Sequence, residues 1–497
     1  MKIDCLTPEE MRLAVSGEWL DESVSCREDP VGVVIDSRED LQARCFLAIV
    51  GKRTDGHLWL TSAVEGGAVM LIIQKDHRDV VDPGIAESIP VLLVDDTRVA
   101  LTRLAVAWRD RLDGVVVGIT GSAGKTTTRR LVQSVCERHV EDLPGERGGG
   151  GCTASVKSYN NDIGVPLTIL RARSDDRFLI LEIGTNAPGE IAMLSSLARP
   201  DLVVITNAGR AHLEGLGTVE GVAREKASIL EGLAENGLVV MPAASGPLRE
   251  EVLARLGPNQ SVCDFGAHEG GLQLSGRETI DATGAQRVTC SDGFEFRMRL
   301  PGTHNAMNAL AAILVARALD ITDARIGLGL AELASDPMRF SGEPIGDSGI
   351  MVYNDAYNAN PDAVLAALET FGEVSGEAAR RVLILGDMME LGDDASELHA
   401  EIGRAVLSLR RTTELSCAIF IGPLSANGAR VALEARPDMV IVQLPVLNDA
   451  LSDGLAGLIQ SGDSVLIKGS RSQALERVVA SLRTIRGTTI SPDPQSV

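Results

Sequence analysis

The stretch Val115-Val-Val-Gly-Ile-Thr-Gly-Ser-Ala-Gly-Lys-Thr-Thr-Thr128 decides how this chain is interpreted. An apolar run ends in a glycine turn, which is followed by Lys125, Thr126 and a segment of helical composition. This order predicts a buried strand, a loop whose backbone N–H groups face an anion, and a helix N-terminus that adds partial positive charge. Lys125 would reach the outer phosphates of ATP, and the Thr126 hydroxyl would face Mg²⁺. An ordinary glycine turn between a strand and a helix is the alternative.

The glycine pattern of this loop is shorter than usual. The common phosphate loop has a glycine six residues before the lysine, and here that position is Ile119. Gly121 and Gly124 leave the compact pattern Gly-x-x-Gly-Lys-Thr-Thr. The loop therefore indicates a protein from a group of ATP users that share this compact loop.

Length and composition set the scale of the protein. A chain of 497 residues with 44% hydrophobic content is long enough for about three domains of roughly 150 residues. The alternation of strand-like and helix-like segments places these domains at residues 1–112, 113–336 and 337–497. The net charge of −22 argues against a general nucleic-acid binder or a protein of anionic membrane surfaces, since both need a basic face.

Cysteine usage and hydropathy indicate the compartment. Eight cysteines are scattered without a Cys-x-x-Cys pair, which fits neither a zinc site nor a disulfide framework, so we expect reduced thiols. The N-terminus lacks an apolar signal core, and no apolar run approaches the ~18–20 residues of a membrane span. We therefore expect a cytoplasmic protein without a membrane span.

Short apolar runs alternate with helix-length segments through most of the chain. This pattern predicts an α/β fold with parallel sheets, whose ligands bind at the carboxyl ends of the strands. A connecting helix is expected at 97–110, an antiparallel excursion at about 260–300, and a glycine-rich mobile loop at 145–152. The predicted strands are 31–35, 45–49, 69–73, 115–118, 178–183, 202–206, 238–241, 350–353, 382–385, 418–421, 439–444 and 465–467.

Several polar residues follow these strands. Glu182 ends a buried run, where a charge is costly unless a partner such as Mg²⁺ is near; a glutamate that faces water is the alternative. His212 could bind a second cation or orient phosphate, although a histidine in such a loop is often only hydrogen-bonded. Lys226 has the pattern of a solvated helical lysine. The Asn160–Asn161 pair could simply cap a helix, as could Asn305.

Taken together, these segments are similar to the Mur ligase family, the ATP-dependent amide-bond-forming enzymes of peptidoglycan precursor synthesis. The resemblance covers essentially the whole chain and is greatest to the branch that adds D-alanyl-D-alanine. The motifs that carry it are Gly121–Thr127, Asn160-Asn-Asp-Ile-Gly-Val-Pro166, Glu182-Ile-Gly-Thr-Asn186, Ala211-His-Leu-Glu214, Gly302-Thr-His-Asn-Ala-Met-Asn-Ala-Leu310, Asn354-Asp-Ala-Tyr-Asn-Ala-Asn-Pro361, Gly386-Asp-Met-Met-Glu-Leu-Gly392 and Lys468-Gly-Ser-Arg-Ser472.

The resemblance implies three domains and two substrates besides ATP. A small α/β domain would bind the UDP-sugar, a central phosphate-loop domain would bind ATP, and a Rossmann-like domain would close over it. The substrates would be UDP-N-acetylmuramoyl-tripeptide and D-alanyl-D-alanine, joined through an acyl phosphate by a monomeric enzyme.

The resemblance also implies residue roles. Lys125, Lys226, His212 and Glu182 would be catalytic, and Mg²⁺, as two ions, would be held by Thr126, Glu182 and His212. Lys226 occupies a position that is carbamoylated in many relatives. ATP would be bound by Gly121, Ser122, Ala123, Gly124, Lys125, Thr126, Thr127, Asn305, Arg339 and Asp355, and the UDP-substrate by Asp36, Ser37, Arg38, Asp55, His57, Asn160 and Asn161.

Two other functions stay open on the sequence. A ligase that adds a diamino acid to UDP-N-acetylmuramoyl-dipeptide usually carries an Asp-Asn-Pro-Arg motif, which this chain lacks. A non-catalytic nucleotide-binding scaffold would have no need to keep Glu182, His212 and Lys226 together.

Overall fold

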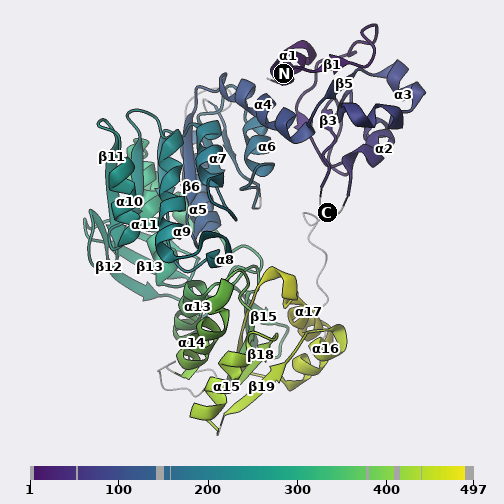
Figure 1. Ribbon diagram of the computed structural model, residues 1–497. Helices are drawn as coiled ribbons and strands as arrows, with labels where there is room; N and C mark the ends of the chain where they lie inside the picture. The colour runs from purple at the N-terminus through teal and green to yellow at the C-terminus, as the bar shows by residue number, and fades with distance from the viewer. Residues whose placement is uncertain are drawn as a thin grey trace.

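The computed structural model describes residues 5–51, 54–141, 150–156, 158–376, 380–407, 415–437 and 439–486. In this part of the chain, three β-sheets follow one another along the sequence, and helices cover each of them (Figure 1). The predicted α/β class is confirmed. Each of the predicted domains 1–112, 113–336 and 337–497 contains one sheet, while the domain bounds themselves stay a prediction.

The first sheet, purple in Figure 1, has the order β1-β5-β4-β3-β2. It is parallel except for β1, which runs antiparallel to β5. The predicted strands at 31–35, 45–49 and 69–73 are confirmed as β2, β3 and β4, although β2 is only two residues long. The elements are α1 (Pro8–Val15), β1 (Glu18–Trp19), β2 (Val33–Val34), β3 (Cys45–Leu47), η1 (Gly56–Trp59), α2 (Leu60–Glu65), β4 (Met70–Gln74), η2 (Lys75–Val80), α3 (Pro83–Ser88) and β5 (Val91–Val94).

A single helix, α4 (Thr97–Arg109), leads from the first sheet to the central one, as predicted (Figure 1). The helix begins where the Asp96 carboxylate accepts the backbone N–H groups of residues 98 and 99, a standard N-cap. Near its other end, Trp108 Nε1 donates to the Ala172 carbonyl at 2.8 Å. The connector is therefore packed on both domains.

The central sheet has nine strands in the order β14-β13-β12-β11-β10-β9-β6-β8-β7. It is parallel from β7 to β12 and antiparallel from β12 to β14. The predicted antiparallel excursion is confirmed for β12–β14, but its first part is wrong, because β11 extends the parallel region. The strands are β6 (Val115–Thr120), β7 (Cys152–Ala154), β8 (Phe178–Glu182), β9 (Leu202–Ile205), β10 (Leu238–Pro242), β11 (Ser261–Gly266), β12 (Leu272–Thr279), β13 (Gln286–Cys290) and β14 (Glu295–Met298).

The glycine-rich loop predicted at 145–152 needs a second correction. Residues 145–149 lie outside the described residues. Cys152 is not a loop residue, because it begins the edge strand β7, which pairs with β8.

Two helical layers cover the central sheet. Alternate strand residues point to opposite faces, so Val116 packs with one layer and Val117 with the other. The first layer consists of α4, α6 (Gly164–Arg171), α7 (Glu190–Ala198), α9 (Val219–Ala227), η3 (Ser228–Gly232) and α10 (Pro247–Arg255). The second consists of α5 (Lys125–Glu141), α11 (Thr303–Ala318) and α12 (Asp323–Glu332).

The third sheet, green to yellow in Figure 1, has the order β15-β16-β20-β17-β18-β19 and is parallel except for β15. The five predicted strands are confirmed, and β15 was not predicted. The elements are β15 (Ser341–Ile345), β16 (Ile350–Asp355), α13 (Pro361–Val374), β17 (Arg380–Gly386), η4 (Gly392–Asp394), α14 (Ala395–Leu407), β18 (Leu415–Ile421), α15 (Ala426–Ala435), β19 (Val440–Leu444), α16 (Asp449–Leu458), β20 (Asp463–Lys468), η5 (Arg471–Gln473) and α17 (Glu476–Ile485).

Helix α13 joins the third domain to the central one at both of its ends. In its first turn, Asp362 accepts hydrogen bonds from the backbone and guanidinium of Arg210 at 2.8–2.9 Å, and Arg210 also pairs with Glu401 of α14 at 2.6 Å. In its last turn, Glu373 pairs with Arg277 of β12 at 2.5 and 2.8 Å. Within the described residues, no helix is long and apolar enough to cross a membrane.

Candidate active site

A cavity of about 1320 Å³ lies where the central and third domains meet, and Gly51 and Arg98 of the first-domain side reach its wall. Loops at the carboxyl ends of β6, β8 and β9 form its central-domain side, as expected for parallel sheets. The predicted site residues that line it are Ser122, Ala123, Gly124, Lys125, Thr126, Thr127, Asn160, Asn161, Glu182, His212, Asn305, Arg339 and Asp355. Gly121, Lys226, Asp36, Ser37, Arg38, Asp55 and His57 are not part of its wall.

The loop between β6 and α5 has the shape that its glycines require. Gly121 and Gly124 have φ of +147° and +82°, a region that other residues rarely adopt, and a Cβ at either would collide with Thr206 or Asn308. The Ala123 N–H donates to Asn207 Oδ1 at 2.9 Å, which holds the loop against the end of β9. Helix α5 begins at Lys125, so its N-terminus points into the cavity.

Lys125 lies over this loop. Its Nζ donates to the Gly121 carbonyl at 2.5 Å. Burial lowers the pKa of Lys125 from its usual value, and Arg339 acts in the same direction, whereas Glu182 opposes the shift. The next residue, Thr126, accepts a hydrogen bond from Arg339 Nη2 at 3.1 Å, so the third domain reaches the loop directly.

Glu182 is a buried carboxylate at the end of β8, with 1% of the residue exposed. Asn160 Nδ2 donates to its Oε1 at 2.9 Å. Its Oε2 lies 3.8 Å from Arg129 Nε and has no hydrogen-bond partner among the described residues. An unsatisfied buried carboxylate oxygen beside a phosphate loop fits a cation ligand, because burial without a partner is costly.

Lys226 is a second buried charged residue without a hydrogen-bond partner in the described part of the chain. It lies on α9 and is fully buried, so the prediction from pattern alone of a solvated lysine is wrong. Burial lowers the pKa of Lys226 well below its usual value, and the charge of Lys125 adds to the effect, while Glu225 and Glu190 oppose it. These surroundings favour the neutral form of the amine.

His212 connects the central domain to the third. Its Nδ1 lies 2.7 Å from Oε2 of Glu390, which follows β17. Burial lowers the pKa of His212, and the nearby charges of Lys226 and Lys125 lower it further, while Glu390 raises it. These three residues are therefore close enough to interact, although Lys226 is not part of the cavity wall.

The third domain contributes a cationic edge that the sequence only partly indicated. The Arg339 guanidinium stacks on the Tyr357 ring at 4.1 Å. Asp355 pairs at 2.6 Å with Lys468, a 3%-exposed lysine at the end of β20 for which we predicted no role. Burial raises the pKa of Asp355, and Lys468 and Arg339 oppose this. The Lys468–Ser472 motif was the signal that could have identified this lysine.

Asn305 and Asn161, two of the predicted site residues, each form a hydrogen bond with a nearby backbone group. Asn305 lies in the first turn of α11 and donates from Nδ2 to the Pro301 carbonyl at 2.7 Å, which orients it in the cavity wall. Asn161 Oδ1 accepts the N–H of Gly164, the first residue of α6, at 2.9 Å. Whether these side chains contact adenine or UDP stays a prediction.

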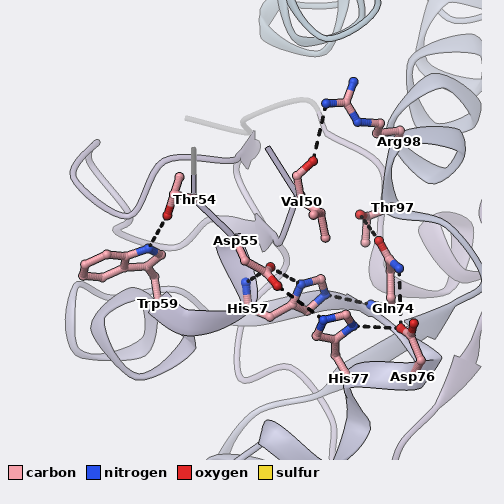
Figure 2. Close-up of polar contacts among 10 residues, drawn as sticks. All are labelled: Val50, Thr54, Asp55, His57, Trp59, Gln74, Asp76, His77, Thr97 and Arg98. Carbon is pink, nitrogen blue, oxygen red and sulfur yellow. Dashed lines mark hydrogen bonds and ion pairs between the residues drawn. The ribbon is translucent and has the colours of Figure 1, made fainter. Parts of the chain in front are cut away.

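The predicted UDP-side residues of the first domain form two local groups. Asp36 and Arg38 make a bidentate pair at 2.6 and 2.9 Å. Figure 2 shows Asp55 beside two histidine rings that stack on each other, with His57 Nδ1 2.6 Å from Oδ1 and His77 Nε2 3.3 Å from Oδ2.

The Asp55–His57–His77 group is compact enough for a metal ion, but its hydrogen bonds argue against one. His57 Nε2 accepts the Gln74 backbone N–H at 3.0 Å, and its Nδ1 faces Asp55. Both ring nitrogens are thus committed. The geometry gives His57 a role in holding the loop at residues 55–57, and its predicted contact with substrate stays untested.

The comparisons with known proteins cover most of the chain and agree with one another. Residues 119–316 match the Mur ligase middle domain, and residues 338–471 match the Mur ligase, glutamate ligase domain. The UDP-N-acetylmuramoyl-tripeptide--D-alanyl-D-alanine ligases of Escherichia coli and Bacillus subtilis are 31% and 33% identical to the chain, over 91% of it and 93% of each relative. With its phosphate loop, buried carboxylate and three sheets, the chain belongs to the Mur ligase family of ATP-dependent ligases.

Solved structures give the same result. The crystal structure of MurF from Acinetobacter baumannii superposes with a TM-score of 0.79 and 25% identity, over 97% of this chain and all of that one. MurF ligase from Thermotoga maritima, solved in complex with ADP, has a TM-score of 0.73 and 26% identity, over 91% and 97%.

Proposed function

We propose that this protein joins D-alanyl-D-alanine to UDP-N-acetylmuramoyl-tripeptide at the expense of ATP, in peptidoglycan precursor synthesis. The observation that carries the proposal is the full-length likeness to ligases of that name, together with a phosphate loop that opens into a cavity shared with the third domain. ATP and the UDP-linked substrate are polar and phosphorylated, so we expect the protein to act in the cytoplasm, and a monomer stays an expectation from the family resemblance.

The reaction we propose has two steps. The tripeptide carboxylate attacks the γ-phosphate of ATP, forming an acyl phosphate and releasing ADP. The amine of D-alanyl-D-alanine then attacks the acyl carbon, loses a proton, and displaces phosphate through a tetrahedral intermediate. Two anions meet in the first step, so the site must offset the charge between them.

Residues of both domains meet this requirement. The N–H groups of Gly124 and Lys125, at the start of α5, would cradle the phosphates, with Lys125 as the cation nearest the transferred group. Arg339 adds a second cation from the third domain, 3.1 Å from Thr126. Contacts from two domains would enclose the reacting atoms and so limit hydrolysis of the acyl phosphate.

The residues present also fit Mg²⁺. Thr126, Glu182 and His212 would hold it, because Oε2 of Glu182 has no hydrogen-bond partner among the described residues and an imidazole nitrogen can also bind a cation. The ion would supply positive charge that stabilises the phosphoryl oxygens. Lys226 fits carbamoylation, because the neutral form of a buried amine can add CO₂ at Nζ and release a proton. The resulting carbamate would place a negative charge near Lys125 and His212.

The remaining predicted contacts complete the proposal. Asn305 would bind adenine and Asp355 the nucleotide, while Asp36, Ser37, Arg38, Asp55, His57, Asn160 and Asn161 would border the UDP-sugar.

The test is phosphate release by the purified full chain with ATP and Mg²⁺. We expect release only when UDP-N-acetylmuramoyl-tripeptide and D-alanyl-D-alanine are both present, with the pentapeptide product detected by mass spectrometry. Release driven by the dipeptide precursor and a diamino acid would replace our assignment with the neighbouring ligase. ATP binding without turnover of any pair would indicate a scaffold.

A further inference from the structure

The hydrogen bond between His212 and Glu390 spans 178 residues of sequence and joins two domains. His212 stands at the end of the central sheet, in the wall of the cavity. Glu390 stands in the loop after β17, and 54% of its side chain is exposed. The contact therefore lies at the rim of the interface, with its histidine end inside the site.

The backbone around this contact is built to hold it. The Glu214 N–H donates to the Glu390 carbonyl at 3.2 Å, and Leu213 packs against the core of the third domain. His212 and Glu390 both have left-handed backbones, with φ of 57° and 62°. Non-glycine residues persist in this region only where the surrounding structure fixes them, and such positions cluster at functional sites.

The chemistry of the pair defines the histidine tautomer. Nδ1 of His212 lies 2.7 Å from the Glu390 carboxylate, which can only accept a hydrogen bond when ionised. A neutral imidazole whose Nδ1 faces a carboxylate carries its proton on Nδ1. The lone pair is then on Nε2, and histidines that bind metals are commonly oriented by just such a carboxylate behind the ring.

We infer that Glu390 is a positioning residue, by which the docked third domain presents His212 Nε2 to the cation of the central domain. The inference rests on the proposed function, since it takes His212 to be a ligand. Removing Glu390 leaves Nδ1 without its acceptor and frees the ring to rotate or to change tautomer. Cation binding and docking of the third domain therefore favour each other, as reciprocity requires.

The experiment titrates the full chain, in the presence of a non-hydrolysable ATP analogue, with Mn²⁺ in place of Mg²⁺. Electron paramagnetic resonance measures free Mn²⁺, and the nitrogen modulation in electron spin-echo spectra reports a bound imidazole. The variants are His212→Ala, Glu390→Ala, Glu390→Gln and the double variant. Glu397→Gln is the control, because Glu397 is an exposed glutamate of the same domain, paired only with Arg404 among the described residues.

We expect Glu390→Ala to weaken the histidine-dependent Mn²⁺ site about tenfold, the low end for such partners because Glu390 is half exposed. The nitrogen modulation should shrink with it. Glu390→Gln keeps an acceptor oxygen and should retain most of the affinity, and Glu390→Ala should add nothing to His212→Ala.

The outcomes distinguish the positioning role of Glu390 from the ligand role of His212. If His212→Ala weakens Mn²⁺ binding and abolishes the nitrogen signal while Glu390→Ala changes neither, the positioning role is refuted and the ligand role stands. If His212→Ala itself changes nothing, the cation assignment in the proposed function is wrong and the positioning role is refuted with it.

Discussion

The ion network around Arg210 makes the strongest prediction about how the two domains cooperate. The Arg210 guanidinium donates three side-chain hydrogen bonds to carboxylates of the third domain, two to Asp362 and one to Glu401. Arg210→Met keeps the apolar stem of the side chain and removes all three. The backbone N–H of residue 210 still bonds to Asp362, so the loop keeps one anchor.

The size of the effect follows from exposure. Hydrogen bonds to charged groups contribute about 1.5–3 kcal/mol when well shielded, and exposed ion pairs about 0.2–1 kcal/mol. The side chains of Arg210, Asp362 and Glu401 are 26%, 42% and 35% exposed, which places the network between these limits. We expect docking of the third domain to weaken by about 1–2 kcal/mol, a factor of about 5–30.

Two measurements check this expectation. The KM for ATP should rise by up to that factor, because Arg339 and Asp355 reach the cavity only from the docked domain. Small-angle scattering of the substrate-free protein should show a larger radius of gyration. Arg430→Met, which removes an exposed pair with Glu434 inside one helix, should change neither. An Arg210→Met protein with unaltered KM and radius would refute the reasoning.

Three further predictions concern single side chains. Lys125→Met should lower kcat by about 10²–10³-fold in the phosphate-release assay, because it removes a cation from the transferred phosphate, yet the melting temperature should not fall; a fall would make the loss structural. Burial, with help from Lys468, lowers the pKa of His304 to about 4. In the unfolded chain the pKa of this histidine is about 6.5. Between about pH 6.5 and about pH 4 the unfolded chain therefore binds a proton that the folded protein does not bind, and the free energy of unfolding falls by up to about 3 kcal/mol as the pH drops through this window. His304→Gln should flatten that fall in melting curves, and an unchanged slope contradicts the assignment. Glu225 is buried and accepts the N–H groups of residues 189 and 191 at the start of α7, so Glu225→Gln should cost about 1–3 kcal/mol in denaturant unfolding, and a cost near zero would mean that the amide replaces the carboxylate.

Sequence alone predicted most of the buried parallel strands, although β5, a buried parallel strand of four residues, was missed. Strands such as β6, β8 and β20 are covered on both faces, so they appear as uninterrupted apolar runs. The edge strands β7 and β15 were missed for the opposite reason. β15 contains Gly342 and Pro344 and pairs on one side only, which leaves its pattern indistinguishable from a loop.

The site residues likewise fall into those that the sequence predicts and those that it does not. The glycines, Lys125 and Thr126 were predictable because phosphate binding is encoded within one short segment. Lys468 and Glu390 were not assigned roles, because their partners Asp355 and His212 lie 113 and 178 residues away. The burial of Lys226 was equally hidden, since its neighbour Lys125 comes from another strand-loop-helix unit.

Helix α13 pairs with the central domain at both of its ends, which limits how the third domain can move. Asp362 in its first turn forms an ion pair with Arg210 of the central domain, and Glu373 in its last turn forms one with Arg277. The two anchors are eleven residues apart, about 16 Å along the helix. A body pinned at two points keeps a single rotation, about the line through the pins. If both ion pairs of α13 hold while the contacts at Glu401, Glu390 and Arg339 break, the third domain can rotate about α13, and this rotation moves Arg339 and Asp355 across the phosphate loop.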